Sequence, residues 1–370
     1  MRLFLLISII FSFSWSVYLS NKSCKECHKD IYNEYQRSYH SKGYFNDILH
    51  RHVSDKISTK KYDCATCHMP SASNIKNIID GTSRPKSNNI TQKDAISCFF
   101  CHTIAYVKKS HKFNINVSAK QAEDYKPTMY GTLNNPDEND KHSSVNNPLY
   151  EKNVCLGCHS HKRNQNDLLI FQAINSSTNV KECIKCHMPK IPGGNENMNK
   201  RGRLTHHSHY FEGIHSYAMR KKAVKLNLKI NLPNSIKITL KNKMSHPLII
   251  QSSREMYLRA EIKRGNKIIW SNKKDKQAYF KYDYLRNKKP IVIPYTATSY
   301  SFANNLKAKK EKIFNYKTPK LNKGDKVIIS FYMIIAKKDC IDDVGLKNSG
   351  LDKPILTNQL IKILKNTGKN

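Results

Sequence analysis

Cysteine and histidine recur in one short pattern through the first half of this 370-residue chain. The five Cys-x-x-Cys-His copies are Cys24/Cys27/His28, Cys64/Cys67/His68, Cys98/Cys101/His102, Cys155/Cys158/His159 and Cys183/Cys186/His187. In such a motif the two thiols add across the vinyl groups of a haem, and the histidine supplies the proximal iron ligand. The sequence therefore predicts five c-type haems, each with its iron on the histidine of its own motif.

Two other uses of paired cysteines fit the pattern less well. A structural zinc site needs two thiolate pairs, or one pair with two histidines at finger spacing. Here the number of pairs is odd, and a histidine follows each pair directly. Pairs at this spacing are also more typical of redox or haem sites than of a disulfide framework. The eleventh cysteine, Cys340, is predicted to be a buried or free thiol, because Ile341 and Asp342 exclude a sixth motif.

Residues 1–16 have the features of a signal peptide. Met1 and Arg2 precede an apolar run from Leu3 to Phe13, and Ser14-Trp15-Ser16 offers small residues for cleavage. This predicts export to the periplasm, where c-type haem is attached. One positive charge makes a weak leader, so an uncleaved segment that tethers the protein to the membrane stays open as an alternative.

The chain is strongly basic. It has 64 Lys and Arg against 28 Asp and Glu, a formal net charge of +36. Five haems with ionised propionates remove only a small part of this charge. The charge favours acidic redox proteins, an anionic membrane surface or a membrane quinol-oxidising complex as partners, although an AT-rich genome explains a lysine-rich composition equally well. Nucleic-acid binding is not predicted, because no groove-reading motif accompanies the charge.

Residues 20–220 hold every motif and predict a multihaem cytochrome domain. About 40 residues per haem are too few to bury a protein core of ordinary size. We therefore expect short helices and loops wrapped around stacked haems, with each motif at the start or end of a short helix. Amphipathic helices are predicted at Asp30–Tyr39 and Asp167–Asn175.

Residues 222–340 change to period-two alternation, which predicts a mostly antiparallel β-sandwich-like domain. The expected strands are 224–232, 236–241, 256–262, 267–270, 290–293 and 327–335. Residues 341–370 are predicted to be a helical tail, with an amphipathic helix from Pro354 to Lys365.

Sixteen histidines less the five proximal ones leave eleven, and low-spin haems need one further ligand each. The remaining histidines are His40, His50, His52, His111, His142, His161, His206, His207, His209, His215 and His246. Five of the eleven would suffice, and a surface position is the alternative for any one of them.

The haem region resembles a known family of multihaem cytochromes. The segments that carry the likeness are Cys24–His28 with Ile31, Tyr35, Ser38 and His40; Ala95–Ile104; His142 with Asn147-Pro148 and Val154-Cys155; and the endings Met69-Pro70 and Met188-Pro189. The family includes the tetrahaem electron carrier of ammonia oxidisers and, more distantly, hydroxylamine oxidoreductase and pentahaem nitrite reductase. The resemblance implies that His40 and His142 are distal ligands.

The likeness continues past the haem region. His209–His215 and Asn242–Leu248, ahead of Arg254 and Leu258, are similar to multihaem cytochromes that carry a C-terminal β-domain. Those proteins usually have glycine where Ser245 stands, and Ile249, Ile250 and Gln251 replace their turn. His246 is expected to be a ligand or a docking contact. The candidate distal ligands are His40, His142, His111, His209, His215 and His246.

Two functions follow from this set. The favoured one is a periplasmic electron carrier with five mostly bis-histidine haems and no catalytic residue. The alternative is a reductase of a small nitrogen or sulfur oxyanion, which needs one open or lysine-ligated iron with Arg, His or Tyr nearby. Pentahaem nitrite reductase usually attaches its active-site haem at Cys-x-x-Cys-Lys, whereas all five motifs here end in histidine.

Overall fold

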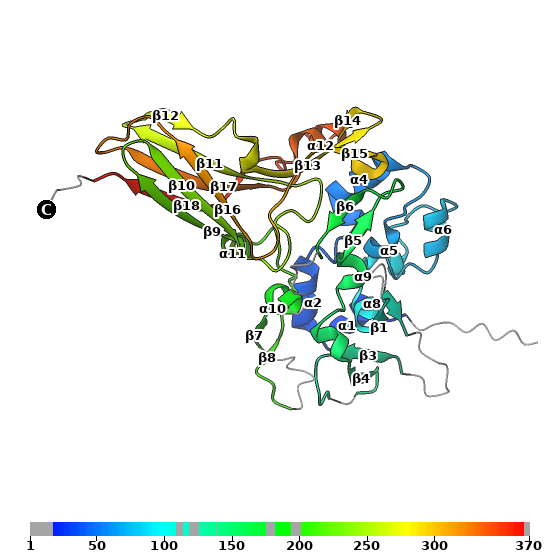
Figure 1. The fold of residues 1–370 in the computed structure, drawn as a ribbon. Coiled ribbons are helices and arrows are strands. Elements are labelled where there is room, and N and C mark those ends of the chain that lie inside the picture. Colours follow the sequence, from blue (N-terminus) through cyan, green and yellow to red (C-terminus); the bar gives the residue numbers. More distant parts are fainter. Residues whose placement is uncertain are drawn as a thin grey trace, which may run out of the picture.

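A helical N-terminal part and a β-rich C-terminal part lie side by side in the computed structural model (Figure 1). The structure describes residues 18–108, 114–117, 126–137, 139–174, 182–193 and 201–365. The predicted signal peptide and His111 fall outside these ranges. None of the helices within them has the length and apolar composition that a membrane crossing requires.

The N-terminal part is built from short helices. They are α1 (Asn21–Lys25), α2 (Lys29–Arg37), α3 (Gly43–Asn46), α4 (Ile48–Ile57), α5 (Ala65–His68), α6 (Ile75–Asp80), α7 (Ile90–Lys93), α8 (Cys98–His102), η1 (Pro148–Glu151), α9 (Leu156–His159), α10 (Glu182–His187) and α11 (Tyr217–Ala223). Each of the five motifs meets one of these helices, as predicted. Helix α2 confirms the helix expected at Asp30–Tyr39.

Pairs of short strands join the helices. They are β1 (Ile104–Val107) with β2 (Asn114–Asn116), β3 (Thr128–Gly131) with β4 (Ser143–Asn146), β5 (His161–Arg163) with β6 (Leu169–Gln172), and β7 (Lys190–Pro192) with β8 (Thr205–His207). The helix predicted at Asp167–Asn175 is wrong, because these residues include β6. That strand pairs with β5, and the Gln172 backbone N–H donates to the Ile250 carbonyl at 2.9 Å. Tertiary pairing therefore decides the structure of this short apolar segment.

The C-terminal part consists of two antiparallel sheets that share one core. One sheet has the order β16 (Glu311–Lys317), β10 (Ser235–Asn242), β9 (Val224–Asn231). The other contains β11 (Glu255–Arg264), β12 (Lys267–Ser271), β13 (Tyr279–Arg286), β14 (Lys289–Ile291), β15 (Ser299–Asn304), β17 (Lys326–Ile334) and β18 (Ile355–Ile363). Alternate residues of facing strands, such as Ile238, Leu258 and Phe331, meet in the core, as period-two sequences do when one face is buried.

The predicted helical tail is wrong for its main segment. Residues Ile355–Ile363 form β18, which pairs with β17 from Lys326 to Met333, so the larger sheet continues beyond residue 340. A helix does occur earlier, as α12 (Lys338–Asp343), and Cys340 is buried in it as predicted. The apolar residues of the tail fit both the alternation of a strand and the three-to-four-residue spacing of a helix. The edge of β17 offers unpaired backbone groups, and pairing with them favours the strand.

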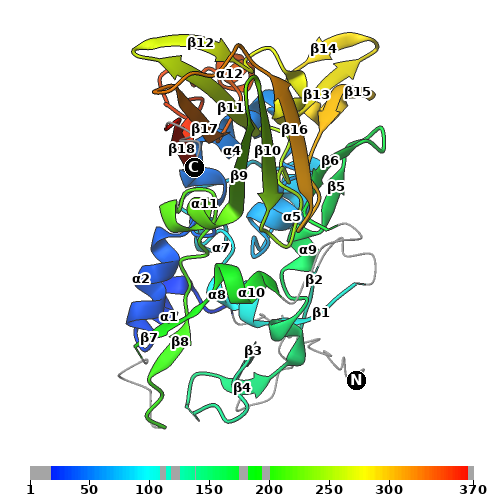
Figure 2. The same ribbon diagram turned by 60° about the vertical axis from the view of Figure 1, so that its left-hand side comes forward.

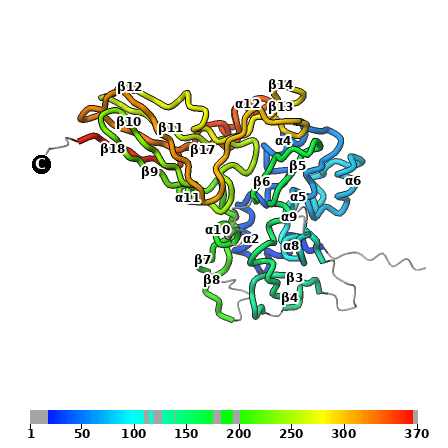
Figure 3. Tube along the Cα trace, viewed as in Figure 1, coloured from blue at the N-terminus to red at the C-terminus, as the bar shows by residue number. Residues whose placement is uncertain are grey.

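The two parts are joined by a common apolar cluster. Ile341 and Val344, at α12, pack with Leu49 and Val53 of α4. Figure 3 shows the two segments side by side, although they are far apart in the sequence. Asn164, after β5, donates to the carbonyls of Pro294 and Ala297 at 2.8 Å each. Figure 2 shows the two sheets at the top of the view, with β3, β4, β7 and β8 at the opposite end.

Candidate haem sites

Each motif is wound into a helical turn that turns its three functional side chains to one side. Residues at i, i+3 and i+4 share a helix face, and these are the positions of the two cysteines and the histidine. In the first motif the His28 backbone N–H donates to the Cys24 carbonyl at 2.9 Å. Ser20 and Ser97 cap the helices of the first and third motifs by accepting from backbone N–H groups.

Four of the five proximal histidines face a second histidine at a spacing that fits an iron. The ring centres are 6.3 Å apart for His28 and His142, 6.2 Å for His102 and His209, 5.9 Å for His40 and His159, and 6.4 Å for His187 and His246. Two imidazoles on opposite sides of one metal have ring centres about 6 Å apart, because each metal–nitrogen bond is about 2 Å long. The donor sets therefore fit bis-histidine haem iron.

Backbone carbonyls orient several of these rings. Nδ1 of His102 lies 2.7 Å from the Tyr130 carbonyl, and Nδ1 of His209 lies 2.7 Å from the His207 carbonyl. Nδ1 of His246 lies 2.8 Å from the Pro247 carbonyl, and Nδ1 of His187 contacts the Glu212 carbonyl. When Nδ1–H donates to a carbonyl, Nε2 is left with the lone pair that binds a metal.

Burial keeps five of the paired imidazoles neutral. It lowers the pKa of His40 and His209 to about 3 and the pKa of His28, His159 and His246 to about 4. A metal needs the unprotonated imidazole. These five imidazoles are therefore in the protonation state that ligation requires.

The second motif is arranged differently. His50 of α4 stacks on His68 with ring centres 3.7 Å apart and planes 11° apart, which leaves no room for a metal between them. Nε2 of His50 lies 2.7 Å from the Tyr62 hydroxyl. No other described ring pairs with His68 at the spacing of the four pairs.

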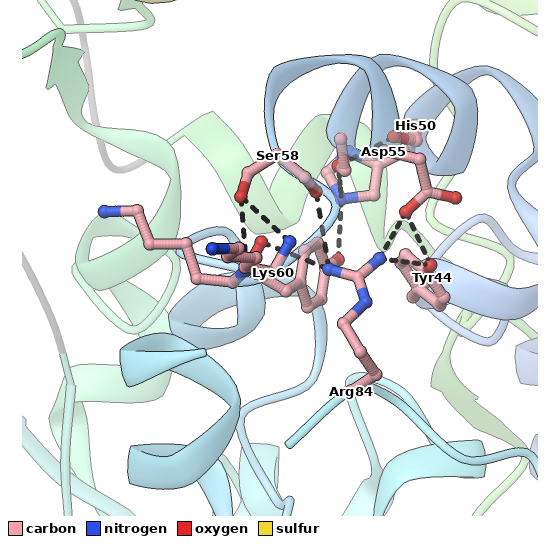
Figure 4. A network of polar contacts seen from close by, with 9 residues as sticks. Tyr44, His50, Asp55, Ser58, Lys60 and Arg84 are labelled. Atoms are coloured by element: carbon pink, nitrogen blue, oxygen red, sulfur yellow. Dashed lines mark hydrogen bonds and ion pairs between the residues drawn. The ribbon is translucent and has the colours of Figure 1, made fainter. Parts of the chain in front are cut away.

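A polar network holds α4 in this position (Figure 4). Arg84 donates to the Tyr44 hydroxyl at 3.0 Å and to the Asp55 carboxylate, and Tyr44 donates to the same carboxylate at 2.7 Å. Gly43, just before Tyr44, has a φ of +46°, and a Cβ there would lie 2.8 Å from the His68 carbonyl oxygen. The chain after His40 is therefore fitted closely against the second motif.

The remaining histidines have other surroundings. His215, a candidate distal ligand, is exposed and stacks on Tyr39 at 3.9 Å, and the structure brings it to no described proximal ring. Nδ1 of His206 lies 2.6 Å from the Gly193 carbonyl, and its Nε2 lies 2.9 Å from Glu34. His50, which is not among our six candidates, is the histidine in contact with His68; no signal in the sequence distinguishes it from its neighbour His52.

The motifs lie close to one another in space. The thiols of Cys24 and Cys98 are adjacent, and so are those of Cys67 and Cys158. These contacts join the first motif to the third and the second to the fourth. Asn21 and Tyr35 strengthen the first junction, since Asn21 accepts from the Cys98 backbone N–H at 2.8 Å and donates to the Tyr35 hydroxyl at 3.1 Å.

Two of the ten predicted attachment residues, Cys27 and Cys186, lie away from these junctions between motifs. Cys27 is half-buried in the turn between α1 and α2, where its backbone N–H donates to the Cys24 carbonyl at 3.3 Å. Cys186 lies on α10 and, unlike the other nine motif cysteines, is exposed. The described part of the chain brings neither thiol to a cysteine of another motif. Haem attachment at Cys27 and Cys186 therefore stays a prediction from motif spacing, to which the tertiary contacts add nothing.

Comparison with known proteins agrees with this arrangement. Residues 23–103, which contain the first three motifs, match the profile of the family described as cytochrome c554 and c-prime. No curated protein matches the chain. A penta-heme cytochrome c552 from Thermochromatium tepidum has a similar fold, with a TM-score of 0.72 at 20% identity, over 94% of this chain and 99% of that one. The family match, the shared fold and the five motifs together support a multihaem c-type cytochrome.

Proposed function

We propose that this chain carries electrons through five covalently bound c-type haems. The observation that carries the proposal is that the histidines of all five motifs form one connected cluster. The pKa of His40 is lowered mainly by burial and in part by the proximity of His68, His159, His187 and His209, so all four lie near it. His102 affects His28 in the same way, which connects the first motif to the third.

This connection supports electron transfer from haem to haem rather than substrate chemistry at a single haem. Each motif is within reach of another, and four proximal histidines have a partner ring at bis-histidine spacing. Iron with two imidazole ligands has no position left for substrate. The count of five haems is also supported by the similar structure, which is named as a penta-heme cytochrome.

The count and the ligands can be tested separately. The denatured mature protein should carry the mass of five haems and give five equivalents in a pyridine haemochrome assay. His40→Ala should keep all five and convert one from low to high spin in the electron paramagnetic resonance (EPR) spectrum. His52→Ala is the matched control, because Nδ1 of His52 contacts the Val344 carbonyl at 3.0 Å and its ring pairs with no described proximal histidine. Fewer than five haems would contradict the haem count. An unchanged spectrum for His40→Ala would contradict its role as a ligand.

The place of action and the partners are part of the proposal. The apolar N-terminus supports export to the periplasm, either as a free protein or tethered there by that segment. The net charge of +36 supports acidic redox proteins as partners, with an anionic membrane surface or a quinol-oxidising membrane complex as alternatives. Electron transfer to an acidic acceptor should slow as salt rises. A rate independent of salt, or an equal rate with a basic acceptor, would argue against steering by charge.

The second motif supports a second candidate function, reduction of a small nitrogen or sulfur oxyanion. His50 is stacked on His68 and is also engaged by Tyr62, so it is not placed across an iron from His68. An open cleft of about 550 Å³ lies nearby, lined by Tyr44, Phe45, Arg51, His52 and Asp55. Neither His50 nor His68 lines it, and for this reason we favour the carrier.

Spectroscopy separates the two functions. A carrier should show five low-spin ferric haems and no change with nitrite, hydroxylamine or sulfite. A persistent high-spin signal that these ligands perturb, with turnover by a dithionite-reduced dye, would establish the reductase instead. Under the reductase, His68→Ala should remove the perturbed signal.

A further inference from the structure

Arg254 is a cation of the β-rich part that reaches the histidine cluster. It immediately precedes β11 and follows Gln251, which forms a β-bridge with Phe171 of β6. Burial lowers the pKa of its guanidinium to about 10, so the group is still charged at neutral pH. It is therefore a fixed positive charge at the junction of the two parts.

The neighbours of Arg254 belong to two histidine pairs. The Arg254 backbone N–H donates to the Gln251 carbonyl at 3.2 Å, Gln251 is bridged to Phe171, and the ring centre of Phe171 lies 6.3 Å from that of His159, which faces His40. Burial is the main cause of the lowered pKa values of His159 and of His246, which faces His187, and the charge of Arg254 adds to both. The pKa of His215 is also lowered, first by burial and then by the charge of Arg254. The guanidinium thus lies near the sites of the fourth and fifth motifs.

The guanidinium has no direct partner in the part of the chain that the structure describes. Asp47 and Tyr39 act on its pKa through their charge, but neither forms a hydrogen bond or an ion pair with it. The Asp47 carboxylate instead caps α4 by accepting from the His50 backbone N–H at 3.1 Å. Arg254 is partly exposed and an arginine has five N–H donors, so the guanidinium has donors left for a ligand.

We propose that Arg254 binds a propionate of the haem at the fourth or the fifth motif. A c-type haem brings carboxylates with it, and guanidinium pairs with carboxylate through two parallel charge-assisted hydrogen bonds. The inference rests on the proposed haem occupancy of these motifs. It makes the β-rich part a contributor of an anion-binding residue to the cofactor sites, in addition to His246.

The consequence is an electrostatic effect on reduction. A positive charge at a propionate favours the reduced haem, which carries one negative charge more than the oxidised haem. In Arg254→Gln we expect the reduction equilibrium of one haem to become about tenfold less favourable, which is a potential lower by about 59 mV for one electron. Arg254→Lys keeps the positive charge, so its reduction potential should stay close to that of the unmodified protein.

The test is a spectroelectrochemical titration of the full-length holoprotein, with resonance Raman of the propionate-bending band. Arg286→Gln is the control, since it removes the same charge from an exposed position at the end of β13. A lower potential and a shifted band in Arg254→Gln but not in Arg286→Gln would support the proposal. If Arg254→Gln does not mature, Arg254→Lys should still shift the band, because an ammonium cannot make the two parallel bonds.

Two further measurements identify which haem Arg254 contacts. His40→Ala and His246→Ala should mark the haems of the fourth and fifth motifs as high spin, and Arg254→Gln in each background shows which potential moves. Five haems with unchanged potentials and an unchanged propionate band would overturn the role of Arg254 alone. A missing haem at either motif would instead remove the proposed function on which the role depends.

Discussion

The two parts of this molecule are stabilised by different kinds of core. The β-rich part has strands of up to ten residues, and most of the twenty buried apolar residues of its described cluster lie on them. In the helical part, the cluster around Tyr62 and Met69 has six buried residues, and the helices span four to ten. So small an apolar protein core agrees with the proposal that haems complete the core of this part.

This difference explains which sequence patterns were informative in each part. A sandwich buries one face of every strand, so its sequence must alternate. A segment that packs on a haem needs only a few residues in the right positions. The motifs therefore predict the structure of the helical part, and the period-two alternation predicts that of the β-rich part.

The largest effect should come from preventing haem attachment. In the full-length chain without haem, residues 20–220 should exchange their amide hydrogens nearly as fast as an unfolded chain, because their core is absent. The strands from β9 to β18 should remain protected. Hydrogen-exchange mass spectrometry of the two forms measures this, and strong protection of α2 in the haem-free chain would contradict the comparison.

Phe331→Ala should destabilise the β-rich part without changing the haem spectrum. Phe331 is fully buried between the sheets, and a phenylalanine-to-alanine change in a core costs about 3–5 kcal/mol. Ile361→Ala, at a position 54% exposed on β18, should cost less than about 1 kcal/mol. Urea titration followed by far-UV circular dichroism compares them, and equal losses would show that the shared core is not the main source of stability.

His246→Ala tests whether the division between the parts is complete. His246 lies in the β-rich part and its ring faces His187 at 6.4 Å, so its loss should convert one haem to high spin. The change in unfolding free energy should be smaller than for Phe331→Ala. EPR spectra of His246→Ala and of His206→Ala, whose ring nitrogens are both engaged elsewhere, provide the comparison. A spectrum unchanged in both would leave His246 as a docking contact only.

The smallest expected effect is at the ion pair of Asp325 with Arg264. Hydrogen bonds from Arg264, at 2.9 Å to each oxygen, lower the pKa of the Asp325 carboxyl. A lowered carboxyl pKa contributes stability above the unfolded pKa of about 4, and this contribution is lost as the pH falls through the folded value. Asp325→Asn should cost on the order of 1 kcal/mol at pH 7 and less at pH 3. Urea titrations at both pH values measure it, and a difference that grew towards pH 3 would reverse the assigned sign.

Much of the fold was predictable where the local pattern was unambiguous. The strands expected at 224–232, 256–262 and 327–335 correspond to β9, β11 and β17. The predictions failed at β6 and β18, which are short apolar segments compatible with either structure. At both segments, pairing with the edge of a neighbouring strand favoured a strand over a helix. A single sequence does not show which strand edges are open.

The sites divide in the same way. The helical turns that bring the two cysteines and the histidine of each motif to one side could be predicted, because spacings of three and four residues act within one helical turn. The exposure of Cys186 and the position of Cys27 in a turn could not, since burial depends on the surrounding segments. Which distal histidine faces which motif could not be predicted either, since His40 and His159 are brought together across more than a hundred residues. Chain closure over that distance depends on the packing of every segment between them.

By itself, the sequence determined the haem chemistry, the number of motifs, the basic charge and the alternating strands, all of which follow from composition or from neighbours within a few residues. Only the tertiary structure decided the four histidine pairs, the stacking of His50 on His68, the strand β18 and the position of Arg254 beside the cluster. These features depend on contacts between segments far apart in the chain. Such contacts are selected by packing and by unpaired polar groups, which no local pattern encodes.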